Sequence, residues 1–233
     1  MKQLIYLMLA ILTINACHPF EEIAKIAEIP PCIDGDGNVY DTIHIGNQVW
    51  MKENLRTTSY SNGVKLVNIT DNNSWINCNY PAYCWYKNDS TTYVKHGAFY
   101  NWYVADTENN GNKNVCPVGW HVPSKAEWQV LIDYLGGTYE APPKLREEGT
   151  SHWGKDNIDA SNSSGFTVIP VYVRWGENGK FGGDAVFFWS STEKGYVSDE
   201  AVELLIDLNA TYFNNKLKSD GFSIRCVANS NKN

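Results

Sequence analysis

The feature that most constrains the fold is one amphipathic helix whose two ends are both marked, within residues 116–137 (CPVGWHVPSKAEWQVLIDYLGG). Ser124 and Glu127 have the spacing of a capping box, which predicts that the helix begins there. Gly136 and Gly137 favour its end. Because most of the remaining chain is typical of strands and loops, we expect the apolar face of this helix to pack on a sheet. Four residues recur at the spacing of that face: Trp128, Leu131, Ile132 and Leu135.

The composition predicts a folded, loop-rich α+β domain. Of the 233 residues, 13% are aromatic and only 19% are charged, so the chain has ample apolar area for a core. No internal repeat and no second apolar core are evident, which predicts a single domain over residues 32–233. The formal net charge is −7 and Lys and Arg form no cluster, so we expect no nucleic-acid partner.

The first 16 residues are typical of a signal peptide. Lys2 precedes an apolar run, Leu4–Ile14, that is too short to span a bilayer as a helix. The sequence Ile14-Asn15-Ala16-Cys17 resembles a bacterial lipobox, which predicts cleavage before Cys17 and its lipidation. Residues 17–31 are then a tether, and its Glu21-Glu22 pair resembles a surface-export signal. We expect an exported protein with a lipid anchor in the outer membrane, facing the cell surface. An ordinary secretory signal is the alternative.

Outside the central helix, the pattern predicts mainly short strands. Residues 39–45 and 48–51 alternate around Gly46-Asn47, which indicates a β-hairpin. Residues 57–95 show no sustained period and predict a long ordered loop. Gly97–Ala105 fits either a strand or a short helix, and the helix is favoured; residues 144–148 indicate a helical turn or two. Four further strands are predicted at 166–172, 185–191, 201–208 and 222–228.

Residues 34–38 (DGDGN) have the composition of a tight turn and also resemble the start of a calcium loop. The later glutamate that would complete a calcium loop is missing at the required spacing. A β-turn is therefore the favoured interpretation. We expect no cofactor and no metal, with calcium as an alternative that no complete motif supports.

The chain has six cysteines, and an odd number remains once Cys17 is assigned to a lipid. An exported protein can form disulfides. We favour a bond between Cys116 and Cys226, which would tie the loop before the central helix to the last strand. A bond between Cys78 and Cys84 is favoured more weakly. A metal site would need a Cys/His cluster such as paired C-x-x-C, and the sequence has none.

Five motifs resemble, in their order, the major paralogous domain family named from Fibrobacter succinogenes, which is common in Bacteroidetes surface lipoproteins. They are Trp50–Leu55 (WMKENL), Gly97–Tyr103 (GAFYNWY), Cys116–Trp128 (CPVGWHVPSKAEW), Trp189–Glu193 (WSSTE) and Gly221–Val227 (GFSIRCV). The resemblance extends from about Asp34 to Val227.

Two of these segments are also similar to formylglycine-generating-enzyme-like proteins: residues 122–128 (VPSKAEW) and the ending GFSIRC. This similarity implies a C-type-lectin-like fold, with two short helices packed on small twisted antiparallel sheets and long ordered loops. Gly97–Ala105 and Lys125–Leu135 would be the two helices, and the N- and C-terminal strands would lie together.

The sequence favours a protein that is not an enzyme. Formylglycine-generating enzymes use a reactive cysteine pair near the end of the domain, where this chain has only Cys226. No nucleophile elbow, zinc-protease motif or phosphate-binding loop occurs. The pairs Glu147-Glu148 and Asp199-Glu200 can in principle serve glycosidase chemistry, but a solvated surface is the better interpretation. His121 is expected to have a structural role.

Binding is the favoured function, through loops near the C-terminal strands in residues 190–218. Amide, carboxylate and tyrosine side chains there can bond hydroxyl groups and stack on ligands. We expect a glycan or a surface protein as the ligand; the alternatives are a structural or assembly component of the envelope and an enzyme of glycan metabolism. The calcium–sugar motifs of animal lectins are absent. The candidate ligand-binding residues are Glu193, Tyr196, Asn209, Tyr212, Asn214 and Asn215.

Overall fold

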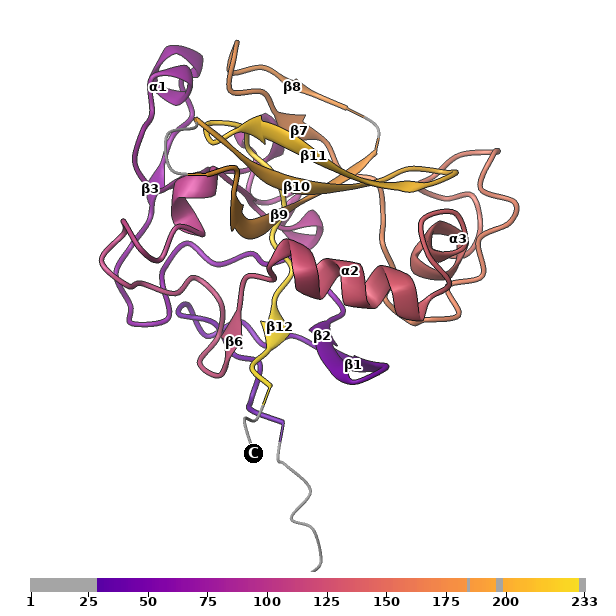
Figure 1. Cartoon of the computed structure of the whole chain (residues 1–233). Helices are drawn as coiled ribbons and strands as arrows, with labels where there is room; N and C mark the ends of the chain where they lie inside the picture. Colours follow the sequence, from indigo (N-terminus) through magenta and orange to yellow (C-terminus); the bar gives the residue numbers. More distant parts are fainter. Residues whose placement is uncertain (1–28, 184, 196–198, 231–233) are drawn as a thin grey trace, which may run out of the picture.

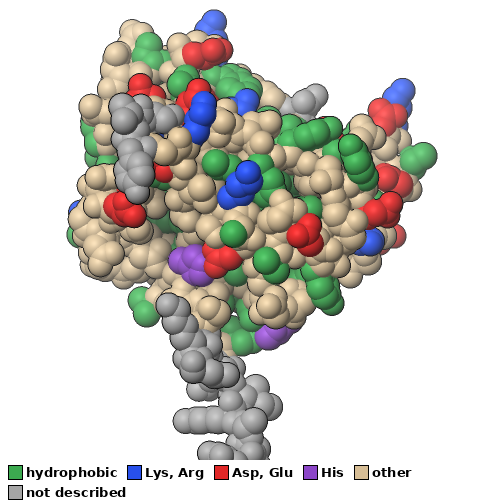
Figure 2. All heavy atoms as spheres, in the orientation of Figure 1, with side chains coloured by type: hydrophobic (Ala, Val, Ile, Leu, Met, Phe, Trp, Pro, Cys, Tyr) green, Lys and Arg blue, Asp and Glu red, His purple; other side chains and the backbone are tan. Residues whose placement is uncertain are grey.

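The computed structural model describes residues 29–183, 185–195 and 199–230 and shows a mixed α+β domain with few helices and several small, mainly antiparallel sheets (Figure 1). The signal peptide, Cys17 and most of the tether predicted above lie outside these ranges, as does Tyr196. Within the described ranges, no helix is both long enough and apolar enough to cross a membrane. On the face drawn in Figure 2, basic and acidic side chains are interspersed.

A four-stranded sheet brings the two ends of the domain together. Its order is β1 (Thr42–Ile45), β2 (Gln48–Met51), β12 (Val227–Ala228) and β6 (Trp120–His121), and neighbouring strands are antiparallel. The predicted hairpin is confirmed, with the turn after β1 at Gly46, whose φ is +61°. The last strand lies beside the hairpin that opens the domain, as Figure 1 shows.

A three-stranded antiparallel sheet of longer strands forms the opposite side of the domain. Its order is β11 (Thr211–Leu217), β10 (Glu200–Ile206) and β9 (Val186–Glu193). The strands predicted at 185–191 and 201–208 are confirmed. The sequence pattern does not predict β11, because Asn214 and Asn215 interrupt its apolar character. This strand is an edge of the sheet.

Helix α2 (Lys125–Tyr134) packs between these two sheets and confirms the predicted central helix. Its capping box is complete: Ser124 N donates to Glu127 Oε2 at 2.8 Å, and Glu127 N donates to Ser124 Oγ at 3.3 Å. Trp128 is fully buried, stacked between Trp50 of β2 and Phe188 of β9 with ring centroids 4.5 Å and 5.3 Å away. The apolar face of α2 therefore joins the two sheets in one core.

Two smaller sheets complete the fold. Strands β3 (Val67–Asn68), β4 (Ala82–Cys84) and β5 (Phe99–Tyr100) form one, in which β3 and β4 are parallel. Strands β7 (Val173–Arg174) and β8 (Phe181–Gly182) form the other.

The helix predicted over Gly97–Ala105 is wrong for its first half. Phe99 and Tyr100 are a strand, and only the 3-10 helix η3 (Trp102–Val104) follows. Tyr100 exchanges backbone hydrogen bonds with Phe222 at 2.9 Å and 3.1 Å, and its side chain is fully buried. These long-range contacts override the local helical spacing.

Three other predicted elements are also corrected. The strand predicted at 166–172 is absent from the described structure: Thr167 has φ +56°, and only Val168 makes an isolated bridge, to Arg146. The helical turn predicted at 144–148 lies earlier, as α3 (Ala141–Leu145), because two prolines occupy its first turn, where they need no N–H partner. Of the strand predicted at 222–228, only β12 and isolated bridges form.

The loop predicted over residues 57–95 is ordered and contains short elements besides β3 and β4. They are the helix α1 (Asn72–Ile76) and the 3-10 helices η1 (Tyr86–Asn88) and η2 (Val94–His96). The buried guanidinium of Arg174 holds this region by donating to Ile69 O at 2.5 Å and Thr70 O at 3.0 Å.

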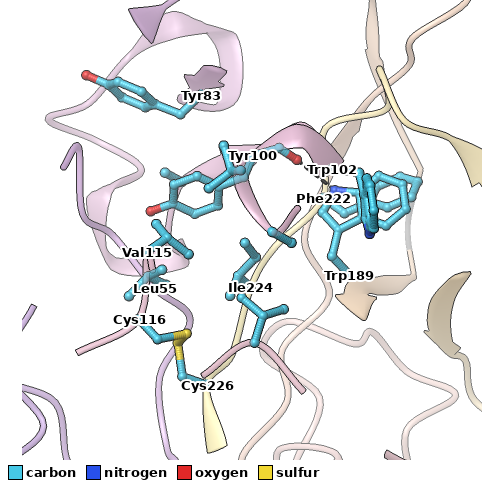
Figure 3. Packing of buried hydrophobic residues seen from close by; sticks show 14 of the residues in the cluster. Leu55, Tyr83, Tyr100, Trp102, Val115, Cys116, Trp189, Phe222, Ile224 and Cys226 are labelled. Atoms are coloured by element: carbon cyan, nitrogen blue, oxygen red, sulfur yellow. Dashed lines mark hydrogen bonds between the residues drawn. A yellow bond between two sulfur atoms is a disulfide. The ribbon is translucent and has the colours of Figure 1, made fainter. Parts of the chain in front are cut away.

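The disulfide between Cys116 and Cys226 is present, as predicted, and lies at one end of a buried apolar cluster that includes Leu55, Val115 and Ile224 (Figure 3). The weaker prediction of a bond between Cys78 and Cys84 is wrong. Both thiols are free and buried, and so is the thiol of Cys32. Cys78 Sγ contacts Tyr80 O at 3.1 Å and Asn101 Nδ2 at 3.4 Å, so its partners are a carbonyl of its own loop region and the amide of the residue that follows β5.

Candidate ligand-binding site

A hollow of about 630 Å³ is lined by several separate segments of the chain. Residues 151–156 form one wall, residues 170–172 form another, and the turn after β10 forms a third. The combination of ring, carboxylate, amide and imidazole groups is typical of a site that recognises a polar organic ligand. The side chains used in the argument below are His96, His152, Trp153, Asp156, Tyr172, Asp207 and Asn209.

Two aromatic rings of the hollow are fixed by contacts behind them. Tyr172 is 47% exposed and stacks on Tyr86 with centroids 4.0 Å apart and an interplanar angle of 3°. Trp153 donates its indole N–H to Val168 O at 2.8 Å. Because both rings are already ordered, a ligand that packs on them would cost little side-chain entropy.

Polar groups enter the hollow from the end of β10. Asp207 Oδ1 accepts hydrogen bonds from the backbone N–H groups of Asn209 and Ala210 at 2.7 Å and 2.8 Å. Among the described residues, Oδ2 of Asp207 has no hydrogen bond, so it remains able to accept one from a ligand. Asp156 adds a second, exposed carboxyl group.

The rings of His96 and His152 lie edge to face at the hollow, with centroids 6.4 Å apart. His152 Nδ1 lies 2.6 Å from Glu147 Oε2, which fixes the orientation of its ring. Burial, with the nearby His152 as a second cause, lowers the pKa of His96 from its ordinary value, which favours the neutral form of this ring. A neutral imidazole can both donate to and accept from a ligand hydroxyl. No group of three or more His, Cys, Asp or Glu residues in the described ranges could hold a metal ion.

The candidate residues named from the sequence do not form one cluster. Asn209 lines the hollow. Tyr212, Asn214 and Asn215 lie along β11, and Glu193, at the end of β9, forms an ion pair with Lys218. Other residues that line the hollow, such as Trp153 and Tyr172, were not among those candidates. They lie in loops without a recognisable motif.

A second, smaller hollow of about 280 Å³ lies beside β11 and contains Asn215. Trp175, Lys216 and Asp220 also line it, and Lys216 Nζ lies 5.5 Å from the centroid of the Trp175 ring. Burial raises the pKa of the Asp220 carboxyl to about 6, although it accepts a hydrogen bond from Gly176 N at 2.6 Å.

Glu203 is a buried carboxyl group on the neighbouring strand β10. Its Oε1 accepts a hydrogen bond from Asn214 Nδ2 at 2.6 Å, and its Oε2 has no hydrogen-bond partner in the described structure. Burial raises the pKa of Glu203 to about 7. Asn214 is therefore committed to an internal contact.

Three features that the sequence singled out have internal contacts. In the turn at residues 34–38, Asp34 Oδ1 accepts from the backbone N–H groups of Asp36 and Asn38, both at 2.9 Å, so this carboxylate serves the turn. His121 bridges Glu127 Oε1 and Asn229 Oδ1, each at 2.7 Å, and so ties the start of α2 to the residues after β12. Of the acidic pairs, Glu147 contacts His152 and Glu200 contacts Lys194.

Comparison with known proteins identifies the family. A family model described as the Fibrobacter succinogenes major domain matches residues 43–228. The chain belongs to this family. The matched range begins in β1 and ends in β12, so the Fibrobacter succinogenes major domain includes the hollow, α2 and the Cys116–Cys226 disulfide. No curated protein and no solved structure matches the chain.

Proposed function

We propose that this protein is a non-catalytic binding module that recognises a saccharide in the 630 Å³ hollow. The observation that carries the proposal is that Trp153 and Tyr172 lie in one hollow with the carboxyl groups of Asp156 and Asp207 and with Asn209. The ring faces suit the apolar C–H faces of a sugar ring, and the carboxylate and amide groups suit its hydroxyls.

The contacts of the polar groups are those that a binding site needs. One oxygen of Asp207 is held by two backbone N–H groups, and the Nδ1 atom of His152 is paired with Glu147. These contacts hold side chains in fixed positions, which favours recognition. Cys226 is bonded to Cys116, so it is not one half of the reactive cysteine pair of a formylglycine-generating enzyme.

The proposal also includes a more specific fold assignment and a cellular location. We assign the domain to the C-type-lectin-like fold, supported by the adjacency of β2 and β12 and by the packing of α2 between the sheets. We also place the protein at the cell surface, held to the outer membrane by a lipid on Cys17, on the strength of its leader sequence. Cys17→Ala should release the protein from the membrane fraction; retention would contradict the lipid anchor.

The direct test is a glycan array probed with the purified protein, with calcium and with chelator. We expect binding to a defined saccharide that is equal in both conditions. Asp156→Ala should weaken binding of that saccharide by about tenfold, the effect of losing about 1.4 kcal/mol. Asp41→Ala is the matched control, because Asp41 is an exposed carboxylate on the first hairpin and does not line the hollow.

Two outcomes would replace the proposal. Failure on every glycan, together with specific recovery of envelope proteins by the purified chain, would favour a structural or assembly role. Turnover of a saccharide that a single carboxylate substitution abolishes would favour an enzyme of glycan metabolism.

A further inference from the structure

Strand β11 presents an open edge. The bond from Lys218 N to Asp199 O (2.7 Å) and the bond from Asp207 N to Ala210 O (3.1 Å) extend the β10–β11 pairing at both ends. In an antiparallel pair, hydrogen-bonded positions alternate, so the even-numbered residues of β11 direct their backbone groups to β10. The odd-numbered residues direct theirs outward. Thr211 N is bonded to Thr138 O at 3.0 Å, whereas Phe213 and Asn215 have no outward backbone partner among the described residues.

This edge lacks the features that usually protect an edge strand. Proteins block open edges with prolines, bulges, charges or covering loops. The β10–β11 register is continuous over all of Thr211–Leu217, and the strand contains no proline. Its one charged side chain, Lys216, lies over the Trp175 ring. Tyr212 and Leu217 are 44% and 37% exposed, so the strand offers accessible apolar groups at both ends.

We propose that β11 pairs with β11 of a second copy of this chain, antiparallel and about a two-fold axis at Asn214. Phe213 then exchanges both outward backbone hydrogen bonds with the second copy's Asn215, and the symmetric exchange forms on the other side of the axis. The two three-stranded sheets become one continuous sheet. This assembly goes beyond the proposed saccharide recognition and does not depend on it.

The side chains of β11 are self-complementary in this register. Tyr212 lies opposite the second copy's Lys216, a pair that suits an aromatic ring and an ammonium group. Asn214 lies opposite the second copy's Asn214, and the second N–H and the Oδ1 atom of each amide, which the bond to Glu203 does not use, can bond the facing amide. No like charges are opposed. Registers centred on Phe213 or Asn215 would pair only part of the strand, whereas the register centred on Asn214 pairs all of Thr211–Leu217. These matches favour a second copy over an unrelated strand.

The first test is the oligomeric state of the purified full-length protein, measured by analytical ultracentrifugation over a range of concentrations. We expect a monomer–dimer equilibrium. Asn215→Pro removes the outward N–H without removing a bond to β10, and proline is tolerated on a strand edge. It should weaken the dimer at least tenfold, whereas Asn215→Ala should leave it unchanged. A protein that stays monomeric at every concentration would overturn the proposal, even if β11 pairs with a strand of another protein.

The second test locates the axis by cross-linking. Facing residues at a non-hydrogen-bonded position have Cα atoms about 4.5 Å apart, within the range of a disulfide. Asn214→Cys should therefore form a covalent dimer under mild oxidation. Asn215→Cys should not, because the two substituted positions would be staggered by two residues, beyond about 7 Å.

The thiols of Cys32, Cys78 and Cys84 should not interfere, because all three are buried, and every protein in this test also carries Cys17→Ala, which removes the cysteine of the tether. Far-UV circular dichroism of each variant should match that of the parent protein. Equal cross-linking of the two variants, or cross-linking of Asn215→Cys alone, would overturn the register. If Asn214→Cys fails to fold, the Asn215→Pro and Asn215→Ala comparison still decides whether the edge forms the dimer.

Discussion

At the scale of single residues, Glu203 is a buried acidic group with an incomplete set of hydrogen bonds. Its carboxyl is fully buried, and one of its oxygens has no hydrogen-bond partner. Burial raises its pKa from 4.5 to about 7, so the fold favours the protonated form. The stability that this preference contributes is full below pH 4.5 and is lost as the pH rises through about 7. Asp220, with its pKa raised to about 6, acts in the same direction.

Glu203→Gln should remove most of this pH dependence, because glutamine is neutral at every pH. Near pH 8 we expect the variant to be more stable than the parent by up to a few kcal/mol, since each pKa unit corresponds to about 1.4 kcal/mol. Near pH 4.5 the two proteins should differ little. Urea unfolding at both pH values measures the effect. Glu148→Gln is the control, because Glu148 is exposed; identical pH profiles for parent and Glu203→Gln would contradict the assignment.

At the scale of elements, the start of α2 depends on its capping box. Ser124→Ala removes the acceptor for Glu127 N and should lower the free energy of unfolding by about 1 kcal/mol. Ser61→Ala, at a half-buried serine in a loop, is the control and should have little effect. Chemical denaturation measures both. An unchanged stability in Ser124→Ala would mean that tertiary packing alone sets the start of the helix.

Elements were predictable where local pattern and tertiary contacts agree. The capping box, the apolar face and the glycines that end helix α2 all lie in one continuous stretch of sequence, and the structure confirms the predicted helix. Residues 97–105 show the opposite case, because their spacing fits a helix while Tyr100 pairs with Phe222, more than a hundred residues away. Strand β11 was missed for a related reason: its asparagines are poor strand formers, and its pairing with β10 supplies the order.

At the scale of the whole molecule, the Cys116–Cys226 disulfide closes a loop with a sequence separation of 110 residues. It ties the segment before α2 to the segment that leads into β12. Replacing both cysteines by serine should lower the free energy of unfolding by about 2 to 5 kcal/mol, mainly because the unfolded chain gains freedom. Thermal unfolding measures the loss. Reduction of the parent protein is the matched comparison; a double variant as stable as the oxidised parent would contradict this role.

The hollow could be predicted from the sequence only in small part, because it exists only in the folded molecule. Asn209 was named as a candidate and lines it. Trp153 and Tyr172 reach it from loops that carry no motif, and His96 reaches it from the 3-10 helix η2. Their polar and aromatic character was visible in the sequence, but the contacts that bring these segments together are long-range.

The central claim is that the hollow binds a saccharide, and a calorimetric titration tests it most directly. The saccharide selected on the array would be titrated into the parent protein, Tyr172→Ala and Tyr139→Ala. Tyr139 is 75% exposed and does not line the hollow, so it is a matched control for Tyr172. We predict that Tyr172→Ala weakens binding about tenfold or more, through the loss of stacking, and that Tyr139→Ala binds like the parent. Equal affinities for all three proteins would contradict the account.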